Sequence, residues 1–586
     1  MGGRYLLHMR KKLHLAFPYR QRFILQIDLE SETYTSIPLE EEEAKRYLGG
    51  RFLALMLWDR FAKYDQLGEE SYERGNPVVF ASGAAVDMPL GYCNSFTVVT
   101  KSPITGSLSV SSASSSFAGA IVGCGYAALV ITGRSRKLCS FSIADGVVSF
   151  SDAEQYHDLT TTDVAKRVGK DHIVVIGPAG EHFVPYASLY VNDQNVGQGG
   201  VGCVCGMKNI KFFTLSPHSY GRDAYDSHRL GLLNQAYLKD LEKSRMGKTI
   251  AREGSIALLS KANHHGWAAI DTYSMRVDGR LWGLCTRSVP EGIPFDDPSF
   301  PVCQDHTLLD LESAMALGSN LELFDSRSVQ QVVLRCLENG LEVVSTGAVL
   351  AWARACRKEG KLSFLPDLQR STAMLYLRLL DAIAYRRGAG NQLGIGLSAL
   401  VEQYGGAEHA FMVDGLPLPP YDYRALPVQA LLASMGKRIV VLGELLWGNH
   451  YHRGRERRLV SWALYIQKLT YACESVGLCP WVTLPSFNHR LFHFPYFSFA
   501  RKNFSRLALL ASLAEGYEIG VHAMRSYGEE ALYLQVSLDD KLLKRNGRFG
   551  SLPDQLLVNG KSNYRSAQVV PLARLLDAYW SAFGRK

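Results

Sequence analysis

The segment Asn192–Lys211, NDQNVGQGGVGCVCGMKNIK, contains five glycines within ten residues. Glycine lacks a Cβ atom, so this backbone can adopt left-handed dihedral angles and approach another group closely. A ligand with phosphates or a fused heterocycle suits such a surface, because bare amide groups can line it. A glycine-rich hairpin that crosses a β-sheet explains the same pattern. The dinucleotide-binding pattern GxGxxG is not indicated, since the preceding YASLYV ends in the polar NDQN instead of entering a turn and helix directly.

The size and composition of the chain predict a soluble globular protein. Its 586 residues provide material for roughly three or four domains, enough to bury a large core without disulfides. A formal charge of +8 is small for this length and argues against dedicated nucleic-acid binding. Basic residues gather near the N-terminus, but no apolar run there is long enough for a signal peptide or a membrane span. We therefore expect a cytoplasmic protein without a membrane span or a nucleic-acid partner.

The eleven cysteines are scattered along the chain and follow no framework spacing. An odd number of cysteines in such an arrangement is typical of a protein from a reducing compartment. No CxxC pair occurs anywhere in the sequence.

Hydropathy patterns divide the chain into a β-rich part and a helical part. FILQIDLESETYTSI (23–37) alternates apolar and polar residues around a polar turn, which predicts a hairpin, and short apolar runs bounded by turn residues continue to about residue 215. From about residue 220 apolar residues recur every three or four positions, and several such runs end in glycine, as helices do. No internal repeat is evident. We predict a basic, disordered arm at 1–20, a β-rich domain at 21–215 and helical domains at 216–420 and 421–586; a docking segment for an acidic partner is the alternative for the arm.

Short motifs recur along the chain in a recognisable order. The β-rich part contains GGRFLA (49–54), GNPVVFASG (75–83), FTVVTKSPITG (96–106), VVIGPAGE (174–181) and GQGGVGCVCGMKNIK (197–211). The helical part contains ALGSNLELFD, GLEVVSTG and ESVGLC. The order of these motifs resembles that of the tungsten-pterin aldehyde ferredoxin oxidoreductases. The resemblance implies an α+β fold, in which an N-terminal β-sheet domain precedes two mainly α-helical domains.

The resemblance also implies cofactors that this sequence does not fully support. Members of the family bind tungsten or molybdenum between two pterin dithiolenes, use a [4Fe–4S] cluster and oxidise an aldehyde to a carboxylic acid. The family's cluster is held by CxxCxxxC and one distant cysteine. The distant cysteine is present as Cys479, but Cys285 alone remains near the expected triplet. Because a cubane cluster needs four thiolates or close substitutes, we predict that the cluster is absent. Cys479 and Cys285 stay as candidate metal residues, although a lone cysteine is more typical of a buried apolar position.

The positions that face the pterins in the family carry altered side chains here. Ser95 stands where the family has a phosphate-binding arginine, and the segment 195–198 has lost its basic residues. Loss of a guanidinium removes a charge-assisted, bidentate contact to phosphate, although serine and asparagine can still donate hydrogen bonds. Two family aspartate motifs carry glutamates, which extend the carboxylate by one methylene. The candidate cofactor-binding residues are Asn94, Ser95, Ser112, Ser114, Asn195, Gly197, Gly199, Gly200, Glu338, Glu342, Glu474 and Leu478.

Glu312 is the candidate catalytic residue, because it aligns with the family's carboxylate before the ALGSN motif and is suited to general acid–base chemistry. A solvated carboxylate at a helix N-terminus explains the same residue. The family's histidine would fall near Val441, where none is present; His450 and His452 lie nearby but out of register.

Two hypotheses about function follow. The favoured one is a non-catalytic or structural subunit of a family oxidoreductase complex. The alternative is a divergent, cluster-free tungsto- or molybdopterin enzyme that oxidises an aldehyde to a carboxylic acid. Either protein would form a homo- or hetero-oligomer with a family member or an electron-transfer protein.

Overall fold

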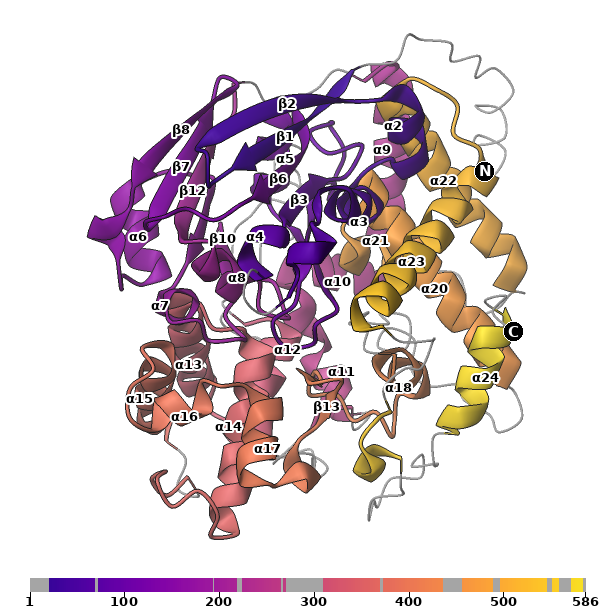
Figure 1. Ribbon diagram of the computed structural model, residues 1–586. Helices are drawn as coiled ribbons and strands as arrows, with labels where there is room; N and C mark the ends of the chain where they lie inside the picture. Colours follow the sequence, from indigo (N-terminus) through magenta and orange to yellow (C-terminus); the bar gives the residue numbers. More distant parts are fainter. Residues whose placement is uncertain are drawn as a thin grey trace.

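The expected succession of a β-rich domain and helical regions is confirmed by the computed structural model (Figure 1). The structure describes residues 21–68, 72–192, 194–218, 224–264, 267–269, 309–368, 372–435, 456–487, 496–544, 551–557 and 571–582. Cys285, the arm 1–20, and the positions of Val441, His450 and His452 lie outside the described residues. Among the helices that the structure describes, none is both long and apolar enough to cross a membrane.

The first sheet has the strand order β2-β1-β6-β3-β4-β5. Its β1–β2 hairpin pairs Ile27 with Tyr34, as the alternation in the sequence predicts. Strands β1 and β6 are parallel, and all other neighbours in this sheet are antiparallel. The strands are β1 (Arg22–Asp28), β2 (Thr33–Leu39), β3 (Val78–Ser82), β4 (Ser95–Lys101), β5 (Leu108–Ser114) and β6 (Tyr126–Thr132).

The second sheet has the order β8-β7-β12-β9-β10-β11 and repeats the topology of the first. It also begins with a hairpin, continues with one parallel neighbour and ends with three antiparallel pairs. This internal repeat is not evident in the sequence, because the two halves share strand order and backbone pairing rather than side chains. The strands are β7 (Cys139–Ala144), β8 (Val147–Asp152), β9 (Ile173–Ile176), β10 (Leu189–Val191), β11 (Gln194–Val196) and β12 (Ile210–Ser216).

The two sheets share one apolar core. Phe141 and Phe213 stack in it with ring centroids 4.8 Å apart, and Phe80 meets Phe213 edge-on at 5.5 Å. Aromatic side chains dominate core burial, so these rings fix one sheet against the other. The helices of this domain are α2 (Glu41–Tyr47), α3 (Gly50–Phe61), α4 (Tyr72–Gly75), α5 (Ser116–Gly123), α6 (Thr161–Val168), α7 (Pro178–Glu181) and α8 (Val201–Met207).

The helical part forms two groups (Figure 1). Helices α12–α17 gather beside the second sheet, and α18–α24 gather beside the first. The helix α13 shows the predicted stop signal: Asp325 caps its start, and Gly340 ends it with a φ of 68°. The first group consists of α12 (Leu311–Ala316), α13 (Ser326–Asn339), α14 (Val343–Lys358), α15 (Ala373–Ala384), α16 (Ala389–Leu393) and α17 (Leu397–Tyr404).

Two early helices pack with the second group rather than the first. Helices α9 (Ser227–Lys243) and α10 (Arg245–Glu253) contact α21 (Pro480–Phe487). The division of the helical part at residue 420 therefore stays a prediction. The remaining helices are α11 (Leu259–His264), α18 (Pro427–Ala433), α20 (Glu456–Val476), α22 (Tyr496–Glu515), α23 (Val521–Leu543) and α24 (Leu572–Ala582).

Candidate functional site

The first junction between the β domain and the helices follows the end of α20. The amide of Cys479 donates to the carbonyl of Tyr92 at 2.9 Å, and the amide of Ser95 donates to the carbonyl of Gly477 at 2.9 Å. A Cβ atom on Gly83 would overlap Gly477, so the two backbones are in direct contact. Only glycine allows such an approach.

The second junction follows the end of α13 and repeats these contacts. The amide of Glu342 donates to the carbonyl of Tyr186 at 3.0 Å, and the amide of Ser188 donates to the carbonyl of Gly340 at 2.9 Å. A Cβ atom on Gly177 would overlap the backbone of the same segment. Each half of the β domain therefore contacts one helical group through an equivalent set of backbone hydrogen bonds and close backbone approaches.

The equivalence of the two junctions places Leu337, and not the candidate residue Glu338, at the position that corresponds to Glu474. Gly477 corresponds to Gly340, so three residues earlier Glu474 corresponds to Leu337. Glu338 instead forms an ion pair with Arg335 at 3.0 Å on the half-exposed side of α13. The structure thus places Glu342 and Glu474 at the two junctions but does not bring Glu338 to either.

The glycine-rich segment enters a helix after all, contrary to the sequence interpretation. Its polar start forms the short strand β11, and α8 begins at Val201 after a turn in which Gly197, Gly199 and Gly200 have φ angles of 106°, 98° and 89°. Sequence patterning missed the strand because its residues are polar. A dinucleotide-binding unit is still not formed, since β11 and β12 are separated by β10 and β9 and run antiparallel.

The close approaches of this segment are to the protein's own backbone. A Cβ atom on Gly200 would overlap the carbonyl of Pro185, and one on Gly202 would overlap that of Ser188. Gly206 approaches the carbonyl of Gly180 equally closely. These contacts account for three of the five glycines by packing alone.

A buried ion pair occupies the first junction. Arg51 Nε lies 2.6 Å from Glu474 Oε2, and Arg51 Nη2 lies 3.2 Å from Oε1. Both side chains are 6% exposed, and the guanidinium lies 4.4 Å from the ring centroid of Tyr471. Burial alone would lower the pKa of Arg51, but the Glu474 carboxylate outweighs it and the pKa is raised. Both oxygens of Glu474 are therefore engaged by a permanent cation.

The serines among the candidate cofactor-binding residues bond to neighbouring hydroxyls. Ser95 and Ser114 are 2.7 Å apart between Oγ atoms, and Ser112 Oγ lies 2.9 Å from Thr97 Oγ1, all across β4 and β5. Ser112 also lies 3.5 Å from Arg51 Nη2. Asn94 Oδ1 is buried without a hydrogen-bond partner among the described residues.

At the second junction the carboxylate is engaged by backbone amides. Glu342 caps α14 by accepting from the amides of Val344 at 3.1 Å and Ser345 at 2.7 Å. Asn195 Nδ2 donates to the carbonyl of Leu341 at 2.8 Å. Glu342 and Asn195, both predicted as cofactor-binding residues, therefore lie at this junction. There they bond to backbone groups of the protein.

Two cavities lined by described residues adjoin the junctions. One, of about 30 Å³, lies against Arg51, Ser109, Gln198 and Gln535 and exceeds the roughly 10–15 Å³ that one water molecule needs. A second cavity, of about 210 Å³, lies against Tyr186, Ser345 and Gly396. Both are smaller than the roughly 300 Å³ at the lower end of ordinary ligand pockets. Glu474 and Glu342 are thus engaged within the protein, and a role for them in binding a pterin stays a prediction.

Comparison with known proteins decides the family. The profile for the aldehyde ferredoxin oxidoreductase N-terminal domain matches residues 24–216, and the profile for domains 2 and 3 matches residues 285–585. The chain belongs to the aldehyde ferredoxin oxidoreductase family. The resemblance inferred from short motifs is therefore confirmed.

The relatives of this family member are distant. The tungsten-containing aldehyde ferredoxin oxidoreductase of Pyrococcus furiosus is 27% identical over 496 residues, which cover 78% of this chain and 80% of that protein. The aliphatic sulfonate oxidoreductase WOR-like subunit of the same organism is 22% identical over 422 residues, which cover 64% and 65%. A solved structure, the active-site complex BamBC of benzoyl coenzyme A reductase with 1,5-dienoyl-CoA, covers 97% of this chain and 95% of its own at a TM-score of 0.76. At 16% identity that likeness shows the fold alone.

Glu312, the candidate acid–base residue of this chain, lies in the first turn of α12. It is half-buried and accepts a hydrogen bond from the hydroxyl of Tyr421 at 3.2 Å. Asp310 caps the same helix through the amide of Ser313. Glu312 is therefore held in place rather than fully solvated, and its catalytic role stays a prediction.

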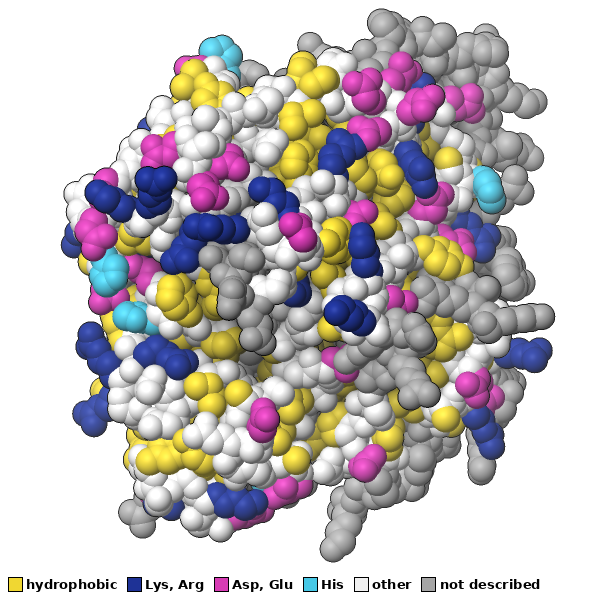
Figure 2. All heavy atoms as spheres, viewed as in Figure 1, with side chains coloured by type: hydrophobic (Ala, Val, Ile, Leu, Met, Phe, Trp, Pro, Cys, Tyr) yellow, Lys and Arg dark blue, Asp and Glu magenta, His cyan; other side chains and the backbone are white. Residues whose placement is uncertain are grey.

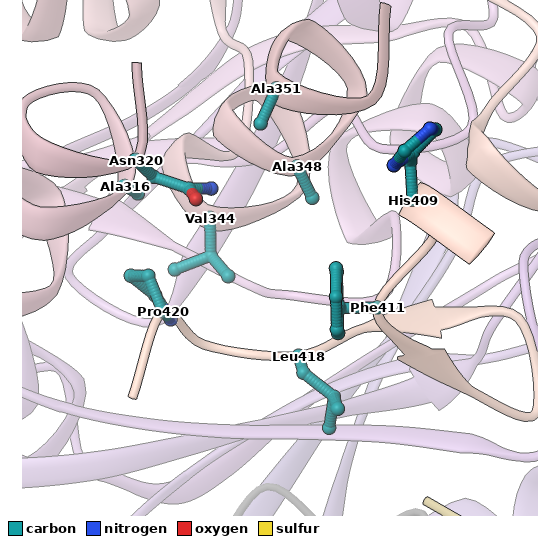
Figure 3. Close-up of a pocket in the computed structure, with 9 residues that line it drawn as sticks. All are labelled: Ala316, Asn320, Val344, Ala348, Ala351, His409, Phe411, Leu418 and Pro420. Atoms are coloured by element: carbon teal, nitrogen blue, oxygen red, sulfur yellow. The ribbon is translucent and has the colours of Figure 1, made fainter. Parts of the chain in front are cut away.

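Another cavity, on the face of α14, is too small for a substrate. Figure 3 shows Val344 and Ala348 of α14 facing Phe411, Leu418 and Pro420 across it. Its volume is about 10 Å³, at the lower limit for holding one water. The surrounding apolar side chains make it a packing gap between α14 and the β13–β14 hairpin (Met412–Val413 and Leu416–Pro417).

The cysteine that a family cluster would use is buried. Cys479 is 3% exposed, and among the described residues it belongs to no group of three potential metal ligands. Cys285 lies outside those residues, so the absence of the cluster stays a prediction. Arg51 was not predicted from the sequence to lie at a junction. The GGRFLA motif contains it, but its partner Glu474 is 423 positions away.

We expect the two cysteines of the glycine-rich segment to resist alkylation in the folded protein. Burial raises the pKa of both Cys203 and Cys205 from 9.0 to about 12. At pH 8 this leaves roughly a thousandfold less reactive thiolate than an unperturbed thiol would have. Mass spectrometry of iodoacetamide-treated protein measures the labelling of each peptide. Equal labelling rates at these cysteines in native and urea-unfolded protein would contradict the expectation.

Proposed function

We propose that this chain is a non-catalytic or structural subunit of an aldehyde ferredoxin oxidoreductase-family complex. The observation that carries the proposal is the buried Arg51–Glu474 pair at the first junction, because it engages the carboxylate that the family motif offers to a pterin. The paired serines and the capping role of Glu342 support the same conclusion. Glu474, Glu342 and the paired serines, which would face a cofactor, instead bond to groups of the protein itself.

The proposal includes a homo- or hetero-oligomer with a family member or an electron-transfer protein, in the cytoplasm. One relative is described as a WOR-like subunit, which is consistent with a role inside an assembly. Nucleic acid is not a proposed partner. On the face in Figure 2, basic and acidic side chains are interspersed, whereas nucleic-acid binding favours a continuous basic surface.

The alternative is a cluster-free tungsto- or molybdopterin oxidoreductase that converts an aldehyde to a carboxylic acid. Three buried polar atoms without hydrogen-bond partners among the described residues favour it: Asn94 Oδ1, Gln198 Oε1 and Ser345 Oγ. Buried polar groups usually have partners, so a ligand beside the junctions would explain these atoms. Glu312 would then be the acid–base residue.

Metal analysis of anaerobically purified protein separates the two proposals. For a non-catalytic subunit we expect tungsten and molybdenum far below one atom per chain, with no cofactor absorbance in the visible spectrum. Stoichiometric tungsten or molybdenum would overturn this proposal in favour of the enzyme. Iron at roughly four atoms per chain would show that a [4Fe–4S] cluster is present. Co-expression with an intact family member and co-purification of the two chains tests the subunit role directly.

A further inference from the structure

A cluster of metal-ligating side chains lies in the second half of the β domain, on residues that make none of the junction contacts described above. His157 and Asp158 follow the short 3₁₀ helix at Glu154–Tyr156, and Glu181 ends α7. One ligand atom from each of these three residues lies within 4.8 Å of the others. Helix α15 contacts α7 there (Figure 1).

The side chains of this cluster lie near the spacing of a metal site. His157 reaches the two carboxylates with different nitrogens: Nδ1 lies 3.7 Å from Asp158 Oδ2, and Nε2 lies 3.9 Å from Glu181 Oε2. An imidazole gives only one nitrogen to a given ion, so the ligand set is one atom from each residue, and these atoms lie within 4.8 Å of one another. Ligands bound at about 2.0–2.2 Å to a tetrahedral ion are roughly 3.3–3.6 Å apart, so side-chain rotation would have to bring the three atoms closer together. His157 is about half exposed and is free to make such a rotation.

A fourth residue orients the cluster. His182 Nε2 lies 2.8 Å from Asp158 Oδ1, the oxygen that does not face His157. Hydrogen bonds of this kind to a ligating carboxylate fix its direction and are common around bound metals. The hydroxyl of Tyr385, which follows α15, donates to the carbonyl of Asp158 at 3.0 Å and anchors the same loop.

The local charge favours a cation. Glu181 is 4% exposed and forms an ion pair with the fully buried Lys211, which neutralises one carboxylate. The Asp158 carboxylate has the His182 imidazole as its hydrogen-bonding neighbour, so one negative charge remains in the cluster when the imidazoles are neutral. Glu181 Oε2 also accepts from the amide of Asp158 at 3.2 Å, which fixes this oxygen toward the loop.

We propose that His157, Asp158 and Glu181 bind a divalent transition-metal ion of the zinc class, with His182 as a positioning residue. Mixed imidazole and carboxylate ligands suit zinc, cobalt or nickel better than magnesium or calcium, which prefer oxygen alone. The bound ion would hold Asp158 in place. Because the carbonyl of Asp158 accepts a hydrogen bond from Tyr385, the ion would also stabilise the contact between the loop after β8 and the end of α15. The inference does not depend on the proposed function, because none of the proposed ligands makes the junction contacts on which that function rests.

Titration of Zn²⁺ into the metal-stripped, tag-free full chain tests the proposal by calorimetry, with the visible spectrum of bound Co²⁺ as a second readout. We expect one site, and at least tenfold weaker binding for His157→Ala and Asp158→Asn. His182→Ala should weaken binding by about 10–100-fold. These side chains are partly exposed, so their variants should fold, which circular dichroism checks. Glu181 is left intact because its loss would leave Lys211 buried without its carboxylate.

Two control variants distinguish this cluster from adventitious binding. His218→Ala removes a histidine that also pairs with an aspartate, Asp145, at 2.7 Å, but belongs to no three-ligand group among the described residues. His409→Ala disrupts the one other such group there, Glu359, Glu408 and His409, where Lys361 already contacts both carboxylates at 2.9 Å. Neither control should change Zn²⁺ affinity. Absence of binding, binding unchanged in His157→Ala, or binding lost in His409→Ala would each overturn the proposal.

Discussion

Replacing Glu474 by glutamine is expected to lower the free energy of unfolding by about 3–5 kcal/mol. Glutamine keeps the shape of the side chain, but it leaves the Arg51 guanidinium charged and buried without its counter-ion. Removal of one partner of a buried pair is costly for this reason, although the intact pair is a weak source of net stability. Denaturant unfolding followed by circular dichroism measures the change in free energy.

Two further variants make this prediction specific. The double variant Arg51→Met/Glu474→Leu removes both charges, so it should recover most of the lost stability. Glu530→Gln removes a partner of Arg46 in an exposed pair at 3.9 Å and should cost less than about 1 kcal/mol. If Glu474→Gln were as mild as Glu530→Gln, the carboxylate would have no structural role at the junction.

Replacing Gly83 by alanine is expected to destabilise the protein by about 3 kcal/mol or more. The added Cβ would overlap the Cα and nitrogen of Gly477 and lie 2.7 Å from the carbonyl carbon of Val476. The overlapping atoms belong to the backbone, which cannot rotate away as a flexible side chain can. The substitution must therefore move the β domain away from the segment after α20. The midpoint of thermal unfolding measures the loss.

Gly231→Ala provides a matched control with the opposite expected sign. Gly231 lies inside α9, and a Cβ atom there has no heavy atom within 4 Å. Alanine has the higher helix propensity, so this variant should gain about 0.5–1 kcal/mol. A Gly83→Ala protein as stable as Gly231→Ala would mean that the two backbones do not meet as the structure describes.

The sequence determined the local structure and the family. Alternation at 23–37 specified a hairpin, three-to-four-residue periodicity specified the helices, and Gly340 specified where α13 stops, because these signals act between neighbouring residues. The order of motifs identified the family, and the profile matches confirmed it.

Only the tertiary structure decided which residues meet. Strand order revealed the repeated sheet, and the equivalent backbone contacts of the two junctions showed that Leu337, not Glu338, corresponds to Glu474. The partner of Glu474 is Arg51, 423 positions away, and the partners of the glycines are distant carbonyl groups. No local pattern encodes such pairs, because hydrogen bonds and close contacts depend on how separate elements are brought together by the whole fold.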